Sequence, residues 1–171
     1  MPNQLHAGLH HRATMKITLL TIGKTSKTYL QDELAVYEKR LQRYVHYTRR
    51  DLPDVRNTKA LPADRLKIQE GKLLLQQLSD TDELWLFDER GQTFSSEELA
   101  GFLRQKADSS VKSLVFAIGG AYGFPPEVYQ RADGLLSLSR MTFSHQMVRL
   151  IATEQLYRAF TIIKGEAYHH A

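Results

Sequence analysis

Cysteine, membrane-spanning apolar runs and a secretory signal are all missing from this sequence. Without cysteine, the chain can form no disulfide bond and offers no thiolate to bind a metal or act as a nucleophile. No apolar run approaches the roughly 18 residues that a membrane-spanning helix needs, and the first fourteen residues lack the apolar centre of a signal peptide. These absences fit a cytoplasmic protein in a reducing compartment, with no membrane partner.

Several motifs of known catalytic or nucleotide-binding sites are missing too. The sequence has no G-x-x-x-x-G-K-[ST] phosphate loop and no G-x-G-x-x-G after its first expected strand, so neither common nucleotide-binding loop is present. It has no H-E-x-x-H or G-x-S-x-G motif and no spaced cluster of His and Cys. Hydrolytic and metal chemistry therefore have little support, and we expect no metal site.

What is present is typical of one globular domain. Of the 171 residues, 42% are hydrophobic and 25% are charged, and no repeat or linker divides them. Met15 precedes the first apolar strand, so we expect a single domain over residues 15–171 and a disordered N-terminal extension over residues 1–14. The histidines of this extension are expected to be solvated; they are His6, His10 and His11.

Short apolar runs alternate with segments of helical periodicity along the chain. This alternation is typical of βαβ units, so we predict an α/β fold with a mainly parallel sheet and helices on both faces. Strands are expected over residues 16–22, 45–52, 83–88, 111–118 and 135–138. Helices are expected over residues 29–44, 62–78, 125–132 and 144–164, with another that begins near a capping box at Ser95–Glu98. Gly165 is the expected C-terminal cap of the last helix.

Three loops follow the third, fourth and fifth expected strands. The apolar run Leu114–Ile118 ends on a glycine-rich loop, Gly119–Gly123, where the backbone can approach a ligand closely. The other two loops cover residues 87–91 and 138–146. Because the carboxyl ends of parallel strands meet at one edge of a sheet, all three loops can line one pocket. The sequence therefore predicts a pocket there for a flat or anionic ligand.

Basic residues are concentrated near the start of the domain. Residues 16–50 hold eight Lys/Arg and three Asp/Glu. Such a cluster could contact nucleic-acid phosphates, in which case binding would weaken as salt rises. A solvated helix face explains the same residues equally well. The cluster consists of Lys39, Arg40, Arg43, Arg49 and Arg50.

Five motifs from Phe87 onward occur in the order and spacing of a known family. They are Phe87-Asp88-x-x-Gly91, Ala117-Ile118-Gly119-Gly120-x-x-Gly123, Leu136-Ser137-Leu138-Ser139-x-Met141-Thr142-Phe143-x-His145, Glu154-Gln155-Leu156-Tyr157-Arg158-Ala159 and Gly165-Glu166-Ala167-Tyr168-His169. From Met15 onward, the chain resembles the SPOUT-class methyltransferases of large-subunit ribosomal RNA, which modify N3 of a pseudouridine in helix 69. Two positions depart from the family pattern: Ser144 replaces a common proline, and His170 replaces a usual Arg or Lys.

The resemblance implies a fold, a cofactor and partners. The implied fold has a C-terminal trefoil knot, and two subunits pair through the last helix as a homodimer. The implied cofactor is S-adenosylmethionine, and the implied substrate is 23S rRNA in the assembled 70S ribosome. A pocket made of loops needs few special side chains, because backbone groups can recognise the edge of an adenine. The implied cofactor-binding residues are Phe87, Gly119, Gly120, Gly123, Leu138, Ser139, Arg140, Met141, Thr142 and Phe143.

Methyl transfer to a ring nitrogen needs positioning and a proton acceptor. Positioning can supply much of the acceleration of an in-line displacement, but the N3–H group is weakly acidic and needs a base or a polarising partner. His145, His169 and Asp88 are the candidates, and Tyr168 could stack on an RNA base. The structural alternatives are a cap or packing role for His145 and a dimer-sealing role for Tyr168.

Three arginines are candidates for contacts with RNA phosphate: Arg140, Arg149 and Arg158. For Arg149 and Arg158, an ion pair with Glu154 and its neighbours on the last helix is an equal alternative. Two other functions also stay open from the residues alone. One is a non-enzymatic RNA- or nucleotide-binding module on the same scaffold, and the other is a flavodoxin-like mononucleotide binder.

Overall fold

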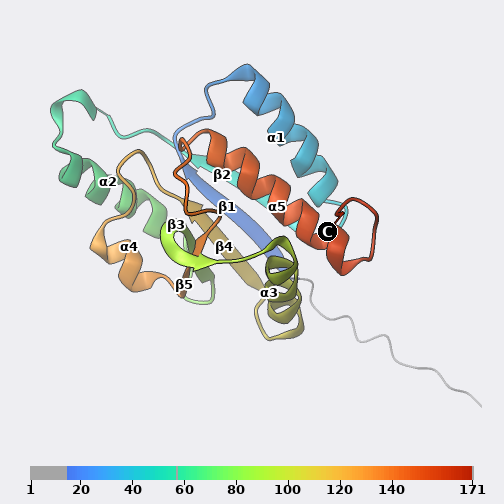
Figure 1. Cartoon of the computed structure of the whole chain (residues 1–171). Coiled ribbons are helices and arrows are strands. Elements are labelled where there is room, and N and C mark those ends of the chain that lie inside the picture. The colour runs from blue at the N-terminus through green and yellow to red at the C-terminus, as the bar shows by residue number, and fades with distance from the viewer. Residues whose placement is uncertain (1–14, 57, 171) are drawn as a thin grey trace, which may run out of the picture.

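The computed structural model describes residues 15–56 and 58–170, so the expectation for residues 1–14 lies outside the described residues. Helices and strands alternate along the described chain, as the apolar runs predicted (Figure 1). In chain order the elements are β1 (Lys16–Ile22), α1 (Thr28–Leu41), β2 (His46–Leu52), the 3-10 helix η1 (Thr58–Ala60), α2 (Ala63–Leu75), β3 (Glu83–Thr93), α3 (Ser96–Asp108), β4 (Ser113–Ile118), α4 (Pro126–Arg131), β5 (Gly134–Ser137) and α5 (Met147–Ile163).

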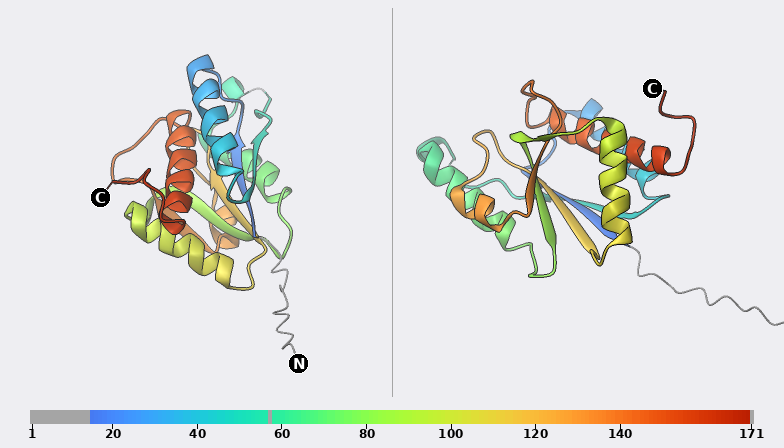
Figure 2. Two further views of the ribbon diagram at one scale, coloured as in Figure 1. Left: turned by 90° about the vertical axis from the view of Figure 1, so that its right-hand side faces the viewer. Right: turned by 60° about the horizontal axis from the view of Figure 1, so that its bottom comes forward.

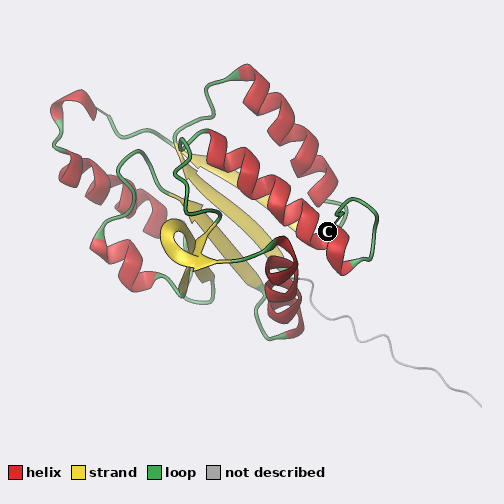
Figure 3. Ribbon diagram, in the orientation of Figure 1, coloured by secondary structure: helices red, strands yellow, loops and turns green. Residues whose placement is uncertain are grey.

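The strands form one parallel sheet in the order β2-β1-β4-β3-β5 (Figure 3). β4 lies in the middle, and all of its residues from Ser113 to Ile118 are buried. This is the burial expected of a strand that is covered on both faces. Successive side chains of β4 point to opposite sides: Phe116 belongs to one apolar core and Ala117 to the other.

Helices cover both faces of this sheet, as Figure 2 shows. On one face α1, α3 and α5 contribute Leu41, Leu103 and Leu156 to the first core. On the other face α2 and α4 contribute Leu74 and Val128 to the second core. The predicted α/β class, with a parallel sheet between two helical layers, is therefore confirmed.

β3 is longer than predicted and bulges outward between Phe87 and Gln92 before it returns to its parallel pairing with β5. The sequence predicted that this strand ends at Asp88, whereas β3 continues to Thr93. Phe87 and Gln92 both pair with Leu136 of β5, so the returning part of β3 lies beside the same strand. A Cβ at Gly91 would come within 2.6 Å of the backbone between Leu135 and Leu136. Glycine at this position therefore allows the returning chain to touch the backbone of β5.

The helix ends follow the capping signals in the sequence. The Ser95 hydroxyl accepts the Glu98 N–H at 3.1 Å, and the Glu98 carboxylate accepts the Ser95 N–H at 2.6 Å, which completes the predicted capping box. Gly165 has a φ of 69°. Backbone bonds from Gly165 to Ile162 and from Glu166 to Thr161 close α5 in a Schellman motif.

Candidate active site

A cleft of about 540 Å³ lies between residues 87–90 of β3 and the carboxyl ends of β4 and β5. Phe87 lies in β3, whereas Gly119 and Met141 come from the loops after β4 and β5, and all three residues line the cleft. The three predicted loops therefore converge, because parallel strands end at one edge of the sheet. The candidate residues that line the cleft are Phe87, Asp88, Gly119, Gly120, Gly123, Leu138, Ser139, Met141, Thr142, Phe143 and His145.

One side of the cleft is apolar and flat. Phe87 stacks on Phe116 of the first core, with ring centroids 5.3 Å apart and an interplanar angle of 21°. Leu138 and Val148 pack against the same core and also line the cleft. Because these side chains are held by the core, they offer a preformed apolar surface to a flat ring.

The glycine loop forms another side of the cleft. The Gly123 N–H donates to the Gly120 carbonyl at 3.1 Å, which closes a tight turn. Gly123 has a φ of 78°, a conformation that costs little only for glycine. A Cβ at Gly119 would lie 3.1 Å from the Gly123 carbonyl carbon. The loop is thus packed against itself, and its glycines present backbone to the cleft beside the Tyr122 side chain.

A carboxylate, a guanidinium and a phenol meet at the rim. The Asp88 carboxylate accepts hydrogen bonds from the Arg90 N–H (2.9 Å), the Arg90 guanidinium (3.2 Å) and the Tyr129 hydroxyl. Burial alone would raise the pKa of Asp88, but the hydrogen bonds from Arg90 and Tyr129 outweigh burial and lower it. Burial and then Asp88 raise the pKa of Tyr129 to about 12. Asp88 is therefore an ionised, fully engaged carboxylate and a weak candidate for the base.

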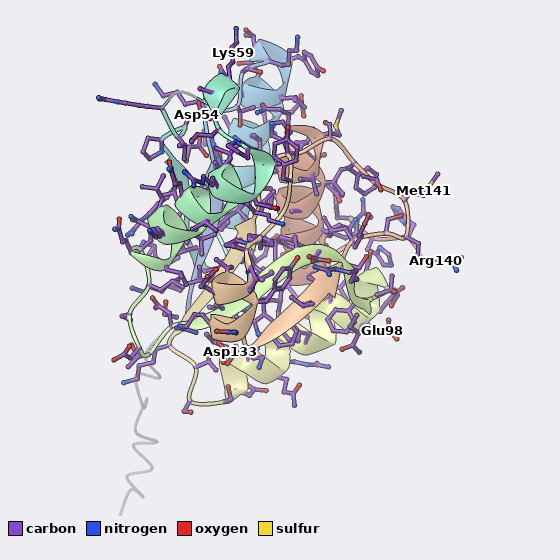
Figure 4. The ribbon with its side chains drawn as sticks, turned by 90° about the vertical axis from the view of Figure 1, so that its left-hand side faces the viewer. Asp54, Lys59, Glu98, Asp133, Arg140 and Met141 are labelled. Atoms are coloured by element: carbon purple, nitrogen blue, oxygen red, sulfur yellow. The ribbon has the colours of Figure 1, made fainter. Side chains whose placement is uncertain are left out.

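The loop after β5 is tied across the cleft to the loop in β3. The Thr142 hydroxyl donates to Glu89 at 3.0 Å, and the Ser139 hydroxyl accepts the Met141 N–H at 2.9 Å. The Met141 side chain is nevertheless 75% exposed, and Tyr122 on the opposite loop is 58% exposed. Figure 4 shows Met141 and Arg140 projecting outward from their loop. Two large uncovered side chains therefore flank the cleft, whereas Arg140 does not line it.

His145 is the second candidate base, after Asp88, that lines the cleft of its own chain. It is exposed at the start of α5, and its ring has no hydrogen-bond partner among residues 15–56 and 58–170. Ser144, at the first departure from the family pattern, accepts the Met147 N–H on its hydroxyl at 3.1 Å. Gln146 accepts the Ser26 N–H at 2.9 Å, which anchors this segment to the loop after β1.

Tyr168 and His169 lie outside the cleft of their own chain. The Tyr168 hydroxyl bonds Glu154 at 3.1 Å and lies 3.3 Å from the Tyr37 hydroxyl. Burial, followed by these neighbours, raises the pKa of Tyr168. The His169 Nε2 lies 2.8 Å from Glu97 on α3, and this contact lowers the pKa of Glu97. Within one chain, both residues thus hold the C-terminal tail against the helical layer.

Arg149 differs from both predictions made for it. It is only 1% exposed, and its guanidinium donates to the carbonyls of Ile22 (2.6 Å) and Gly23 (2.8 Å) and to the Thr25 hydroxyl (3.1 Å). The expectations that it binds RNA phosphate or pairs with Glu154 are therefore wrong for the described chain. These acceptors at the end of β1 enclose the cation completely.

Arg158 forms the ion pair with Glu154 that was the alternative to a contact with RNA phosphate. It pairs with Glu154 at 2.5 Å, one helical turn away, and its guanidinium lies 4.7 Å from the centre of the Tyr168 ring. The group is half-buried on α5 and does not line the cleft. Arg158 therefore supports the tail, and a contact with RNA remains a prediction.

Several residues of the cleft were not predicted. Tyr129 comes from α4 and Val148 from α5, elements that the three-loop argument did not include. Arg90 lies within the first predicted loop, and only its pairing with Asp88 distinguishes it from an ordinary surface arginine. For Tyr129 and Val148, the helix packing that brings the side chain to the cleft is a tertiary feature without a local signal.

Two classes of site find no support in the described chain. Among its residues, no group of three or more His, Asp or Glu could hold a metal ion. None of its helices combines the length and the apolar character needed to cross a membrane.

Comparisons with known proteins agree with one another over nearly the whole chain. The family model described as "Predicted SPOUT methyltransferase" matches residues 15–169. A protein of Cytophaga hutchinsonii named "Ribosomal RNA large subunit methyltransferase H" is 52% identical over 156 residues, which cover 91% of this chain and all of that protein. Proteins of the same name from Flavobacterium johnsoniae and Christiangramia forsetii are 51% and 49% identical, each over 91% of this chain and 99% of its own length.

Solved structures support the fold alone. A probable methyltransferase from Bordetella pertussis superimposes with a TM-score of 0.51 at 11% identity, covering 87% of this chain and 95% of that chain. A probable methylase family protein from Haemophilus influenzae gives a TM-score of 0.50 at 9% identity, over 92% of this chain and 71% of the other.

Proposed function

The chain belongs to the SPOUT methyltransferase family, and from that membership we propose that it transfers a methyl group from S-adenosylmethionine to large-subunit ribosomal RNA. The proposed acceptor is N3 of a pseudouridine in helix 69 of 23S rRNA, presented by the assembled ribosome in the cytoplasm. The observation that carries the proposal is the cleft in which three separate loops of the family motifs meet. The names of the close relatives support an RNA substrate.

The cleft fits the proposed cofactor in size and chemistry. Its volume of about 540 Å³ lies within the range typical of small-molecule sites. The surface formed by Phe87 and Leu138 suits an adenine ring, and the loop from Gly119 to Gly123 brings backbone donors and acceptors within its reach. When bound, S-adenosylmethionine supplies an electrophilic methyl group on a sulfonium. Met141 and Tyr122 are placed to cover the cleft and exclude water.

The protein's part in catalysis is to orient the reactants and remove a proton. Holding donor and acceptor in line can supply much of the acceleration. His145 lies in the cleft with a free ring, so we assign it as the proton acceptor within the chain. His169, another candidate for the proton acceptor, and Tyr168, the candidate for stacking on an RNA base, are anchored away from this cleft. They act at a cleft only if that cleft belongs to a second subunit.

A homodimer paired through α5 satisfies this condition. Met147, Leu150 and Ile151 lie at helical spacing on one side of α5, are half-buried and belong to neither apolar core. A stripe of this spacing suits contact with another helix. We therefore propose that two chains pair along α5, so that each tail supplies Tyr168 and His169 to the partner's cleft.

The return of β3 supports the proposed trefoil knot. β3 pairs with β5 twice, before and after its bend, and the chain then continues from β5 into α5. We propose that the later chain, from β5 into α5, passes through a loop of the earlier chain that this pairing helps to close. The general rule that chains do not thread through loops argues against a knot, so the proposal rests on this double pairing.

Methyl transfer to ribosomes tests the proposed function. Ribosomes that lack the modification are incubated with the chain and S-adenosylmethionine labelled in its methyl group, alongside separate subunits and free 23S rRNA. The expected result is label in 23S rRNA from assembled ribosomes. If RNA binds in a salt-dependent way without taking up label, the chain is a binding module and the proposal fails.

A further inference from the structure

A buried acidic side chain lies behind the glycine loop and has no role in the mechanism above. Glu70 on α2 is 8% exposed. Its Oε2 is buried and has no hydrogen-bond partner among residues 15–56 and 58–170. An unpaired polar group in the interior costs free energy, and an unpaired charge costs more. Glu70 bears this cost on the face of α2 that packs against the glycine loop.

The Glu70 carboxyl packs directly against Gly120 of the loop Gly119–Gly123. A Cβ at Gly120 would lie 2.6 Å from Oε2 and 2.7 Å from Oε1 of Glu70. Real Cβ atoms do not approach other atoms so closely, so the carboxyl group fills the space that a side chain at residue 120 would need. Gly120 itself lines the cleft. The carboxyl therefore forms the layer directly behind a wall of the proposed cofactor site.

The next residue of α2 supports the other end of the same segment. A Cβ at Gly71 would meet the Pro125 ring at 2.4 Å and Val128 at 3.1 Å. Pro125 precedes α4, and Val128 lies within it. Glu70 and Gly71 thus contact both ends of the connection between β4 and α4.

The carboxyl group is best accommodated in its neutral form. Burial, and then the negative charge of Asp54, raise the pKa of Glu70. No ion pair to a cation offsets this burial in the described chain. A neutral carboxyl keeps the shape of the side chain and avoids the cost of an unpaired charge.

From this arrangement we propose that Glu70 is a positioning residue for the cofactor cleft: packed behind Gly120, it holds the loop Gly119–Gly123 in the shape that binds S-adenosylmethionine. This inference rests on the proposed function, because it assigns the cleft to that cofactor. Glu70 does not itself line the cleft. Its effect on methyl transfer passes entirely through the loop.

Calorimetric titration of the full chain with S-adenosylmethionine tests this role through a pair of substitutions. Glu70→Ala leaves a void behind Gly120, so the dissociation constant is expected to rise about tenfold or more, as misplacement of a binding group does. Glu70→Gln is a neutral side chain of the same shape and is expected to keep the affinity within about threefold of the wild type. Leu73→Ala, a half-buried residue of α2 on the second core, is the control that lowers stability without loosening the loop.

A double substitution tests the contact itself. Gly120→Ala alone forces its Cβ against the Glu70 carboxyl and is expected to weaken binding about tenfold. Combined with Glu70→Ala, the same Cβ finds space, so the double variant should bind no more weakly than either single variant. Strict additivity of the two losses would show that the residues act independently.

The possible outcomes separate the two proposals. If the wild type does not bind S-adenosylmethionine, the proposed function fails. If the wild type binds and folded Glu70→Ala binds equally well, only the positioning role fails. If Glu70→Ala does not fold, Gly120→Ala alone decides: weaker binding by about tenfold supports the role, and unchanged affinity in folded Gly120→Ala overturns it.

Discussion

Arg149 is a buried cation whose hydrogen bonds connect two distant segments of the chain. Its guanidinium binds the carbonyls of Ile22 and Gly23, and it also donates to the His145 carbonyl at 3.2 Å. Burial lowers its pKa, and no carboxylate pairs with it in the described chain. The end of β1 is thereby fixed to the start of α5, the segment that carries His145 into the cleft.

Replacing Arg149 should destabilise the fold. Arg149→Met keeps much of the length but leaves the carbonyls of Ile22 and Gly23 without their donor, so we expect the free energy of unfolding to fall by roughly 2–4 kcal/mol. Urea denaturation measures this change. Arg140→Met, at an exposed arginine, is the control and should change stability by less than about 0.5 kcal/mol. Equal stability of the two variants would show that the buried hydrogen bonds contribute little.

Glu70 should also leave a signature in the pH dependence of stability. Its pKa in the folded chain is raised above the ordinary 4.5, so between these two values the folded state holds a proton that the unfolded state has released. The contribution of this group is complete below pH 4.5 and is lost as pH rises through the folded pKa. The unfolding free energy of the wild type should therefore fall relative to that of Glu70→Gln as pH rises above 4.5. Parallel urea-denaturation curves across this range would contradict the raised pKa.

At the scale of elements, the sequence predicted most of the fold because its signals are local. Apolar runs and helical spacing report the face that each segment buries, and the Ser95–Glu98 box and Gly165 mark helix ends by their own hydrogen bonds. Helix ends without such signals differ from the prediction. α1 ends at Leu41 and α2 at Leu75, each about one turn before its predicted end. The return of β3 could not be predicted, because its partner is the backbone of β5, more than forty residues away.

Gly91 is the residue on which this return depends. Gly91→Ala places a Cβ within 2.6 Å of the β5 backbone, so the returning part of β3 must move away. Because Asp88, Glu89 and Arg90 line the cleft just before this point, we expect weaker binding of S-adenosylmethionine and lower stability together. Calorimetry and thermal unfolding of the same sample measure both. Gly101→Ala, on α3 with open space around the position, is the control: it should leave binding unchanged and raise stability by about 0.5–1 kcal/mol, as alanine does in place of glycine inside a helix.

At the scale of the whole molecule, the cleft could be predicted only in part. The rule that parallel strands end at one edge brought Phe87, Gly119 and Met141 together, and they do line one cleft. The contributions of Tyr129 and Glu70 depend on how α4 and α2 pack behind the loops. The burial of Arg149 could not be predicted either, because the carbonyl groups that accept its hydrogen bonds lie at the end of β1, more than 120 residues earlier.

The proposed dimer makes a prediction that no single chain can satisfy. A mixed dimer of a Gly119→Val subunit and a His169→Ala subunit has one intact cleft that faces one intact tail. If tails act across the interface, this dimer should recover roughly half of the wild-type methyl transfer, because one of two symmetric sites is complete. Each homodimer should be inactive.

The reciprocal mixture distinguishes the two arrangements. A wild-type subunit paired with a doubly substituted Gly119→Val/His169→Ala subunit has no complete site if the tail acts across the interface, and one complete site if it acts within its own chain. Methyl transfer by differently tagged, co-purified dimers measures both mixtures. Activity in this second mixture alone would contradict the shared site.

The central claim is that the cleft between the three loops binds S-adenosylmethionine, and calorimetric titration of the purified chain tests it most directly. We predict saturable binding by the wild type and none by Gly119→Val, whose side chain must displace the Gly123 backbone only 3.1 Å from its Cβ, while thermal unfolding shows that the variant remains folded. No heat and no thermal shift for the wild type at millimolar cofactor, or unchanged affinity in folded Gly119→Val, would contradict the claim.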